Sequence, residues 1–436
     1  MQGAFQTWMD PSPTTPGMKS EVEYGSDMSI DVGAVRNQFP SLARTIDGQP
    51  FAFFDGPGGS QVPTVVADAM THSLLHANAN CGGAFATSIE SDAAIDESRQ
   101  AAADFTGSKA DEIAFSANTT TLQYLLAHAV ARTFEPGDEI ITTELDHDSN
   151  VSQWLQVAAD HNLVVHQARL HRTDGTLDLH HLESLLSPKT KIVAFTLASN
   201  HMGTVPPAKE IARHAHSVGA LAWADGVHYA PHRLLDREAM GLDVLLTSPY
   251  KWFGPHLGIA SIRHDLAASW PANRVRPADE TPAGHRFETG TQSHEAMAGM
   301  TAAVDYLAGL GTGSTRRERL TSAYEAIRAH EDVLTHQFWD GVSGMDHLHF
   351  YGITDPKQFG DRVSTFSFTV EGAHPTEVAQ RLAQRGMAVW DGNFYALSAS
   401  LALGLEEHGG AIRVGFLHYT TPEEVDRLIG ALGELG

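Results

Sequence analysis

Short apolar runs alternate with amphipathic segments from about residue 51 to residue 263. The runs at 192–197, 221–225 and 244–246 are apolar almost throughout, as is typical of strands covered on both faces of a sheet. Helix-like segments lie between them, and the one that opens at Asn118 carries its leucines on one side. This alternation predicts an α/β fold with a mainly parallel sheet, whose ligands bind at the carboxyl ends of the strands.

The pattern changes in the last third of the chain. A long helical region is predicted at about 293–341. Beyond it, strands are predicted at 363–370 and near Val389 and Ile412, with a helix at 376–384 between them. These elements predict a second, smaller α+β domain.

These two patterns divide the chain into three predicted segments. Residues 1–30 contain Pro, Ser, Thr and Gly without periodicity, which predicts a flexible tail. We expect a large ligand-binding domain at 31–290, with 31–50 also in reach of the small domain. Interface helices and the small C-terminal domain are expected at 291–436.

The charge and the cysteine content of the chain restrict its possible partners and its expected location. The chain has 29 basic and 53 acidic side chains, a net charge of −24, which excludes nucleic acid and anionic membranes as favourable partners. No apolar run approaches the roughly 20 residues of a membrane helix, and the first residues lack a signal-peptide pattern. The single cysteine, Cys81, excludes an internal disulfide and favours a reducing cytoplasm. No metal site is expected, because Pro231 separates the best-spaced pair, His228 and His232.

Lys251 follows one apolar run and precedes another, at 258–262. Burial would lower the pKa of its amine and make it available for an imine, although a surface lysine in a turn has the same local pattern. Asp225 ends the run at 221–225. Pyridoxal phosphate requires a lysine for its aldehyde, a carboxylate for its ring nitrogen and a phosphate site, so this pair indicates a pyridoxal phosphate enzyme.

With Asp225 and Lys251 in this order, the chain resembles the class V aminotransferase family, and within it the SufS-type cysteine desulfurases. The resemblance runs from about Val32 to the C-terminus. It implies the type I fold of pyridoxal phosphate enzymes, in which a large domain with a seven-stranded, mainly parallel sheet is followed by a smaller α+β domain. It also implies a homodimer in which Thr291 reaches the phosphate bound by the partner.

The resemblance assigns further residues to the cofactor. Each also has a plainer interpretation, as a helix cap, a turn residue or an exposed loop side chain. The residues implied are Thr119, Thr120, Ser248 and Tyr250 for the phosphate, His147 for the face of the ring, and Asn200 and His228 for the phenolic oxygen. Desulfurases usually carry glutamine at the position of His228, so a titratable donor would replace an amide here.

Arg413 lies in an apolar strand at 411–416 and needs an anionic partner. A buried structural ion pair is one solution. The planar guanidinium also suits a substrate carboxylate, and the resemblance places the carboxylate-binding arginine of the family at this position.

The lid departs from the desulfurase pattern. Desulfurases carry Arg-Thr-Gly-His-His-Cys there, and the cysteine accepts sulfur as a persulfide. Here 390–396 reads Trp-Asp-Gly-Asn-Phe-Tyr-Ala, with Tyr395 at the nucleophile position. A phenol cannot carry a persulfide, so Tyr395 is expected to donate a hydrogen bond or a proton. Asn393 and Cys81, the latter in a small-residue loop, are expected beside the substrate.

These features predict an enzyme in which Lys251, His147, Asp225 and Tyr395 are catalytic. The first hypothesis is a carbon-sulfur β-lyase acting on cysteine or an S-substituted cysteine, as occurs in the biosynthesis of sulfur-containing natural products. An aminotransferase, an epimerase or a decarboxylating oxidative deaminase is the alternative, and a desulfurase that uses Cys81 is another. A non-catalytic scaffold that retains the cofactor is disfavoured, because it would not need the full set of residues. The substrate side chain stays open.

Overall fold

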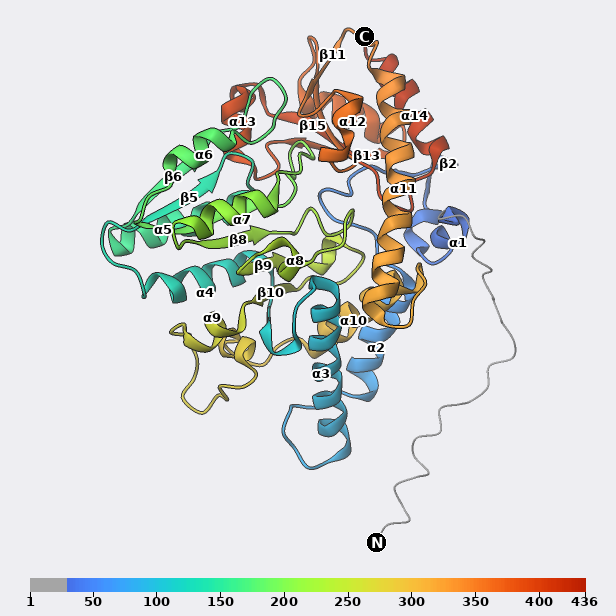
Figure 1. The fold of residues 1–436 in the computed structure, drawn as a ribbon. Coiled ribbons are helices and arrows are strands. Elements are labelled where there is room, and N and C mark those ends of the chain that lie inside the picture. Colours follow the sequence, from blue (N-terminus) through green and yellow to red (C-terminus); the bar gives the residue numbers. More distant parts are fainter. Residues whose placement is uncertain (1–29) are drawn as a thin grey trace, which may run out of the picture.

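A seven-stranded sheet forms the centre of the large domain in the computed structural model, which describes residues 30–436 (Figure 1). The predicted tail lies outside the described residues, apart from Ile30. The sheet order is β4 (Ile113–Ser116), β10 (Gly258–Ile262), β9 (Val244–Thr247), β8 (Leu221–Asp225), β7 (Thr190–Thr196), β5 (Glu139–Thr143) and β6 (Val164–Ala168). Only β10 runs antiparallel to its neighbours, so the predicted mainly parallel sheet is confirmed.

Helices cover both faces of this sheet, and successive side chains of each strand enter different cores. On β7, Phe195 belongs to the core that also contains residues of α3 (Ala86–Thr106), α7 (Ala208–Ser217) and α10 (His294–Gly309). Its neighbour Ala194 packs with α4 (Thr119–Ala131) and α5 (Ser152–His161) on the other face. The apolar runs are therefore continuous because both faces of each strand are buried.

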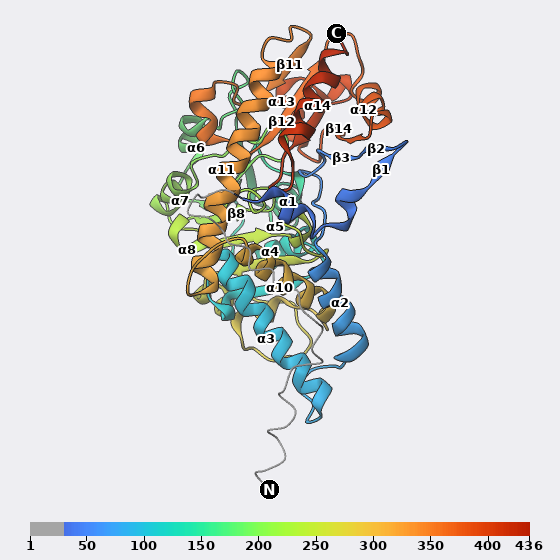
Figure 2. The same ribbon diagram turned by 90° about the vertical axis from the view of Figure 1, so that its right-hand side faces the viewer.

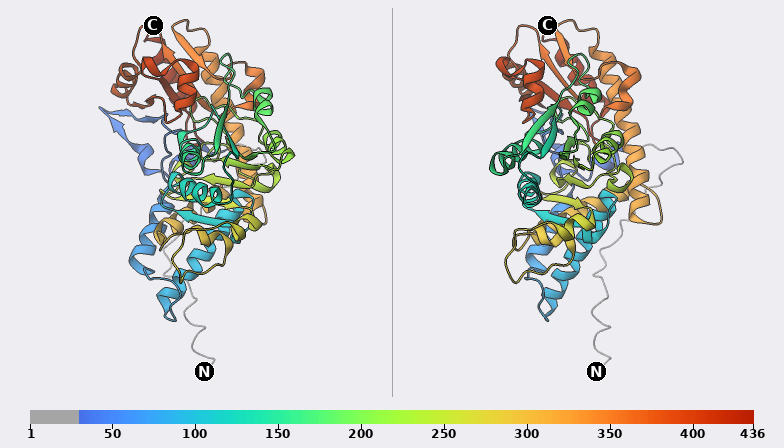
Figure 3. Two further views of the ribbon diagram at one scale, coloured as in Figure 1. Left: turned by 90° about the vertical axis from the view of Figure 1, so that its left-hand side faces the viewer. Right: turned by 60° about the vertical axis from the view of Figure 1, so that its left-hand side comes forward.

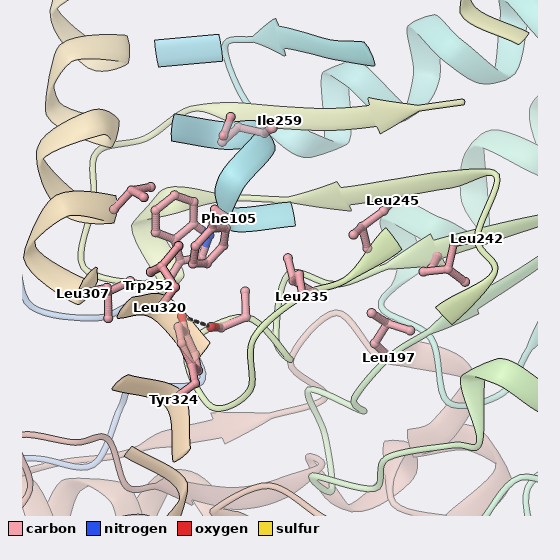
Figure 4. Packing of buried hydrophobic residues seen from close by; sticks show 14 of the residues in the cluster. Phe105, Leu197, Leu235, Leu242, Leu245, Trp252, Ile259, Leu307, Leu320 and Tyr324 are labelled. Atoms are coloured by element: carbon pink, nitrogen blue, oxygen red, sulfur yellow. Dashed lines mark hydrogen bonds between the residues drawn. The ribbon is translucent and has the colours of Figure 1, made fainter. Parts of the chain in front are cut away.

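The residue after Lys251 is held firmly in the first of these cores (Figure 4). Trp252 is fully buried and stacks on Phe105, with ring centroids 4.1 Å apart. Its indole nitrogen donates a hydrogen bond of 3.0 Å to the Thr247 hydroxyl. Packing around Trp252 thus fixes the backbone that carries Lys251.

The small domain is built on an antiparallel sheet with the order β11, β12, β15, β14. It stands at one end of the molecule, opposite α3 and α2 (Thr64–His76), in both views of Figure 3. The strands of this sheet are β11 (Leu348–Tyr351), β12 (Thr365–Val370), β14 (Trp390–Gly392) and β15 (Ala411–Gly415). The helices of the domain are α12 (Pro375–Gln384), α13 (Leu397–Leu403) and α14 (Pro422–Gly433).

Helix α11 (Arg316–Val342) joins the two domains (Figure 2). Its first half, with Leu320 and Ile327, packs in the core of the large domain, and Leu334 and Phe338 in its second half pack in the small-domain core. Within residues 30–436 we find no helix whose length and apolar character would let it cross a membrane.

The N-terminal segment also contacts the C-terminal third of the chain. Strand β3 (Ala52–Phe53) pairs in parallel with β13 (Met387–Ala388), and Asp55 forms a bridge with Gly415. The apolar run at 51–55 is therefore a short edge strand of the small domain rather than a strand of the central sheet. It brings the turn at 56–59 over the end of that sheet.

Candidate active site

Lys251 lies in the turn that joins β9 to β10. Its side chain is buried, and its amine donates a hydrogen bond to the carbonyl oxygen of Pro57. Burial, with Arg413 adding to the effect, lowers the pKa of the amine to about 7. The amine therefore gives up its proton far more readily than an exposed lysine does, as a nucleophile or base requires.

Asp225 ends β8 and is fully enclosed. Its carboxylate accepts hydrogen bonds from the backbone N–H of Val227 at 2.9 Å and from the Gln123 amide at 3.5 Å. Gln123 is itself fixed by the indole of Trp223 and by Gln153, both at 3.1 Å. Burial raises the pKa of Asp225 to about 6, so a cation opposite this carboxylate would stabilise its charged form.

Both residues line an inner chamber of about 130 Å³, and Thr120 at the start of α4 lines it as well. The Thr119 hydroxyl is turned inward, where it contacts the Thr247 carbonyl at 2.8 Å and the Ser248 hydroxyl at 2.5 Å. Thr120 is therefore the residue whose side chain is available to an anion, while free backbone N–H groups of the first turn add to the site. Ser248 and Tyr250 also line the chamber.

His147 lines the same chamber and is uncharged. Burial, with Lys251 and Arg413 adding, lowers its pKa to about 4. The backbone N–H of Ser149 donates to Nδ1 at 3.1 Å, so the ring proton lies on Nε2. A neutral ring in this place can stack on a flat ligand.

Several buried polar atoms around the chamber have no hydrogen-bond partner within the part of the chain that the structure describes. They include Oδ1 of Asn200 and Nδ1 of His228. The other polar atoms of these side chains are engaged, since Asn200 donates to the Phe394 carbonyl at 2.8 Å and Nε2 of His228 lies 3.0 Å from the Thr365 hydroxyl. Unpaired buried polar atoms are costly, which favours a polar ligand beside them. The chamber thus offers a lysine, a carboxylate, an anion site and unpaired polar atoms, and these fit pyridoxal phosphate.

Arg413 extends from β15 toward the chamber and is buried. It donates to the Asn200 carbonyl at 2.7 Å, and its guanidinium carbon lies 4.2 Å from the centre of the Phe394 ring. Its Nε has no partner, and no carboxylate within residues 30–436 forms an ion pair with it. An internal ion pair therefore does not explain this arginine, whereas a ligand carboxylate would satisfy it.

The lid loop brings Tyr395 and Asn393 to the same place. The Tyr395 carbonyl accepts a hydrogen bond of 2.6 Å from the backbone N–H of Asp148, and its ring stacks on His147 with centroids 5.8 Å apart. Phe394 and Tyr395 have φ angles of 57° and 58°, in the left-handed region that residues other than glycine rarely occupy. Asn393 holds the loop by donating to both oxygens of Glu406, at 3.0 and 3.2 Å.

Cys81 and Thr291 lie outside the chamber of their own chain. The Cys81 sulfur is 3.6 Å from Nε2 of His294, and burial together with Asp92 raises the pKa of this thiol. Thr291 is exposed and lines a separate surface hollow with Asn80 and His294. The two residues are thus close to each other but distant from Lys251 in the same chain.

One acidic residue near Lys251 escaped the sequence analysis. Asp55 is mostly buried, and its Oδ1 has no hydrogen-bond partner among the described residues. Burial raises its pKa to about 6, while Arg413 and Lys251 act in the opposite direction. Its place directly after the apolar run at 51–54 was the available signal.

Comparison with known proteins agrees with this geometry. The family model described as aminotransferase class-V matches residues 52–428. A probable cysteine desulfurase of Synechocystis sp. is 32% identical, with 91% of this chain and 94% of that protein covered. The apo structure of the cysteine desulfurase from Thermococcus onnurineus NA1 is 27% identical, with a TM-score of 0.82 over 94% of this chain and 98% of the other.

Another similar structure is a mutant of C-DES with glycine covalently linked to its pyridoxal phosphate cofactor. It has a TM-score of 0.76 and 22% identity, over 92% of this chain and 99% of that one, so the similarity concerns the fold. The chain belongs to the class-V aminotransferase family.

Proposed function

We propose that the protein is a pyridoxal-phosphate-dependent carbon-sulfur β-lyase acting on cysteine or an S-substituted cysteine. Membership of the family supports a pyridoxal phosphate enzyme that acts on an amino acid. The observation that carries the finer proposal is the lining of the site, which combines Lys251, Arg413 and Tyr395 but contains no thiol among the described residues.

The cofactor and the protein divide the chemistry. When bound, pyridoxal phosphate withdraws electrons from the α-carbon of an attached amino acid and so weakens the bonds at that carbon. Asp225 would hold the ring nitrogen, His147 the ring face, and Asn200 and His228 the phenolic oxygen. The side chains of Thr120, Ser248 and Tyr250 would hold the phosphate, with Thr119 contributing through its backbone N–H because its hydroxyl is engaged within the protein. Their place around the inner chamber supports this assignment.

The remaining residues act on the substrate. Arg413 binds the α-carboxylate through its unpaired Nε, and Lys251 removes the α-proton with an amine whose pKa is about 7. The carbon-sulfur bond breaks with both electrons on sulfur, and the Tyr395 hydroxyl supplies the proton that completes the thiol. Water then hydrolyses the remaining three-carbon unit to a keto acid and ammonium.

Product analysis tests this proposal. The holoenzyme is incubated with cysteine, a series of S-substituted cysteines and ordinary amino acids, and the products are identified by mass spectrometry. Equal amounts of thiol, pyruvate and ammonium are expected. A keto acid that retains its sulfur would indicate transamination, the D-amino acid would indicate epimerisation, and carbon dioxide would indicate decarboxylation; any of these as the main product refutes the lyase.

We also propose a homodimer in which Thr291 contacts the phosphate bound by the partner. Exposed apolar side chains on α2 and α3, with Leu75 71% and Ile89 57% exposed, support a covering partner near Thr291 and Cys81. Light scattering should give twice the mass of one chain. Mixed dimers of Lys251→Ala and Thr291→Ala chains should have one wholly intact site, whereas a monomer would contradict the proposal.

A further inference from the structure

The cavity above the cofactor chamber is much larger than cysteine requires. It is open to solvent at its mouth and has a volume of about 810 Å³, against about 130 Å³ for the inner chamber, with which it shares lining residues such as His147, Asn200 and Lys251. Cavities of roughly 300–1,000 Å³ hold ligands of drug size. We call this space the outer chamber, and its wall beyond Lys251 and Arg413 is formed by Tyr124, Asp148, Trp390, Asn393, Tyr395 and Glu406.

Charge is divided unevenly within the outer chamber. The basic side chains Lys251 and Arg413 are buried at its inner end, which we call the floor, whereas Asp148, Asp391 and Glu406 are partly exposed along its wall. In the part of the chain that the structure describes, none of these three carboxylates forms an ion pair with a basic side chain. The wall therefore carries uncompensated negative charge facing a space for a ligand.

Neutral donors hold two of these carboxylates in place without balancing their charge. The Ser152 hydroxyl donates to Asp148, and the Asn393 amide donates to both oxygens of Glu406. The carboxylate of Asp391 also accepts a hydrogen bond from a neutral donor, the Thr376 hydroxyl at the start of α12, at 2.7 Å. Thr376 does not line the outer chamber, whereas Ser152 and Asn393 do, so Asp148 and Glu406 are the carboxylates best placed for a ligand.

Two aromatic side chains complete the wall. Trp390 is 50% exposed and Tyr395 is 75% exposed at the mouth of the chamber. The faces of aromatic rings attract cations, most strongly when the cation has lost some of its water. Carboxylates and aromatic faces together form a surface that suits an ammonium or guanidinium group.

The floor gives an independent reason to expect a ligand in this space. Nε of Arg413 is buried, belongs to a residue that lines the outer chamber, and has no hydrogen-bond partner among residues 30–436. An α-amino acid whose carboxylate occupies this floor would direct its side chain outward along the acidic wall. We propose that the substrate's side chain ends in a positively charged group, bound by Asp148 and Glu406 several bonds beyond the reacting carbon. The cleavage of such a substrate rests on the proposed function, whereas the binding of its charged group does not.

A pair of substrates that differ only in charge tests the inference. S-(2-aminoethyl)-L-cysteine ends in an ammonium, and S-(2-hydroxyethyl)-L-cysteine ends in a hydroxyl of nearly the same size. The holoenzyme should show a kcat/KM at least about tenfold higher for the aminoethyl compound, as a charge-assisted hydrogen bond provides. Glu406→Gln and Asp148→Asn should each reduce this ratio severalfold. Glu407→Gln removes the same charge from an exposed neighbour outside the wall and should preserve the ratio.

Binding without cleavage separates this inference from the proposed reaction. L-lysine and 6-hydroxy-L-norleucine have no sulfur, and their affinities for the holoenzyme are measured by calorimetry. Tighter binding of lysine with no thiol released from either cysteine derivative would uphold the cationic side chain and refute the lyase. Equal cleavage and equal binding within both pairs would refute the cationic side chain and leave the lyase standing. An unchanged ratio in both acidic variants would also overturn the assignment.

Discussion

Replacing Lys251 by methionine should stabilise the cofactor-free protein, by an amount that falls as pH rises. The buried amine has a pKa of about 7, against about 10.5 for lysine in an unfolded chain. Between these values the unfolded state binds more protons than the folded state, so the free energy of unfolding of the wild type rises with pH. Methionine has nearly the same length and no proton to bind, so its variant lacks this dependence.

The size of the effect follows from the two pKa values. The reference is a side chain that binds no proton in either the folded or the unfolded state. Compared with that reference, the lowered pKa of Lys251 reduces the free energy of unfolding of the wild type by about 4 kcal/mol at pH 7 and by about 2 kcal/mol at pH 9. The variant also loses the hydrogen bond to the Pro57 carbonyl, which is worth about 1 kcal/mol. That loss is nearly independent of pH, so the change of about 2 kcal/mol between pH 7 and pH 9 is the quantity to measure.

Urea unfolding of the cofactor-free proteins at pH 7, 8 and 9 provides the measurement. Lys209→Met is the matched control, because Lys209 is exposed on α7, and its difference from the wild type should stay constant with pH. A constant difference for Lys251→Met, or one that grows with pH, would refute the lowered pKa. The expected result would mean that binding the cofactor through Lys251 removes a cost that the folded protein carries without it.

Three further substitutions address the site. Arg413→Ala should raise the KM for amino acids by about a hundredfold, because the substrate carboxylate is left unpaired. Circular dichroism and cofactor absorbance should stay unchanged. Unfolding of the variant, with a normal KM in the folded fraction, would instead show a structural role. Asp225→Asn should retain some cofactor and lose most turnover, as measured by keto-acid release, and wild-type rates would remove Asp225 from the mechanism. Cys81→Ser should keep thiol release within about twofold, because β-elimination needs no sulfur acceptor; lost activity together with a one-sulfur adduct on the wild type by intact mass would support a desulfurase.

The sequence patterns predicted those site residues that lie in strands or directly after them. Asp225 and Lys251 each follow an apolar run, and parallel strands that are adjacent in a sheet place such residues together. Arg413 was identifiable for a related reason, since a charge within an apolar strand needs a partner. Tyr395 was placed in the site because the segment 390–396 resembles the lid of a known family. Its left-handed φ angle could not be predicted, because tyrosine rarely adopts that conformation.

The acidic wall could not be predicted from the sequence. Asp148 follows β5, whereas Glu406 lies in a short turn of the small domain, and nothing in their spacing relates them. They share a cavity only because the lid loop hydrogen-bonds across the two domains. The carbonyl of Pro57 was equally inaccessible, because any residue can present a backbone oxygen.

The meeting of β3 with β13 has a consequence for synthesis of the protein. Lys251 contacts Pro57, Asp55 bridges Gly415, and Arg36 forms an ion pair of 2.9 Å with Glu424. These contacts join segments up to 388 residues apart, so they form late in folding. A nascent chain on the ribosome can assemble the central sheet, but the pocket cannot close until β15 and α14 have emerged. The emergence of these two elements therefore sets the earliest moment at which Lys251 can be enclosed.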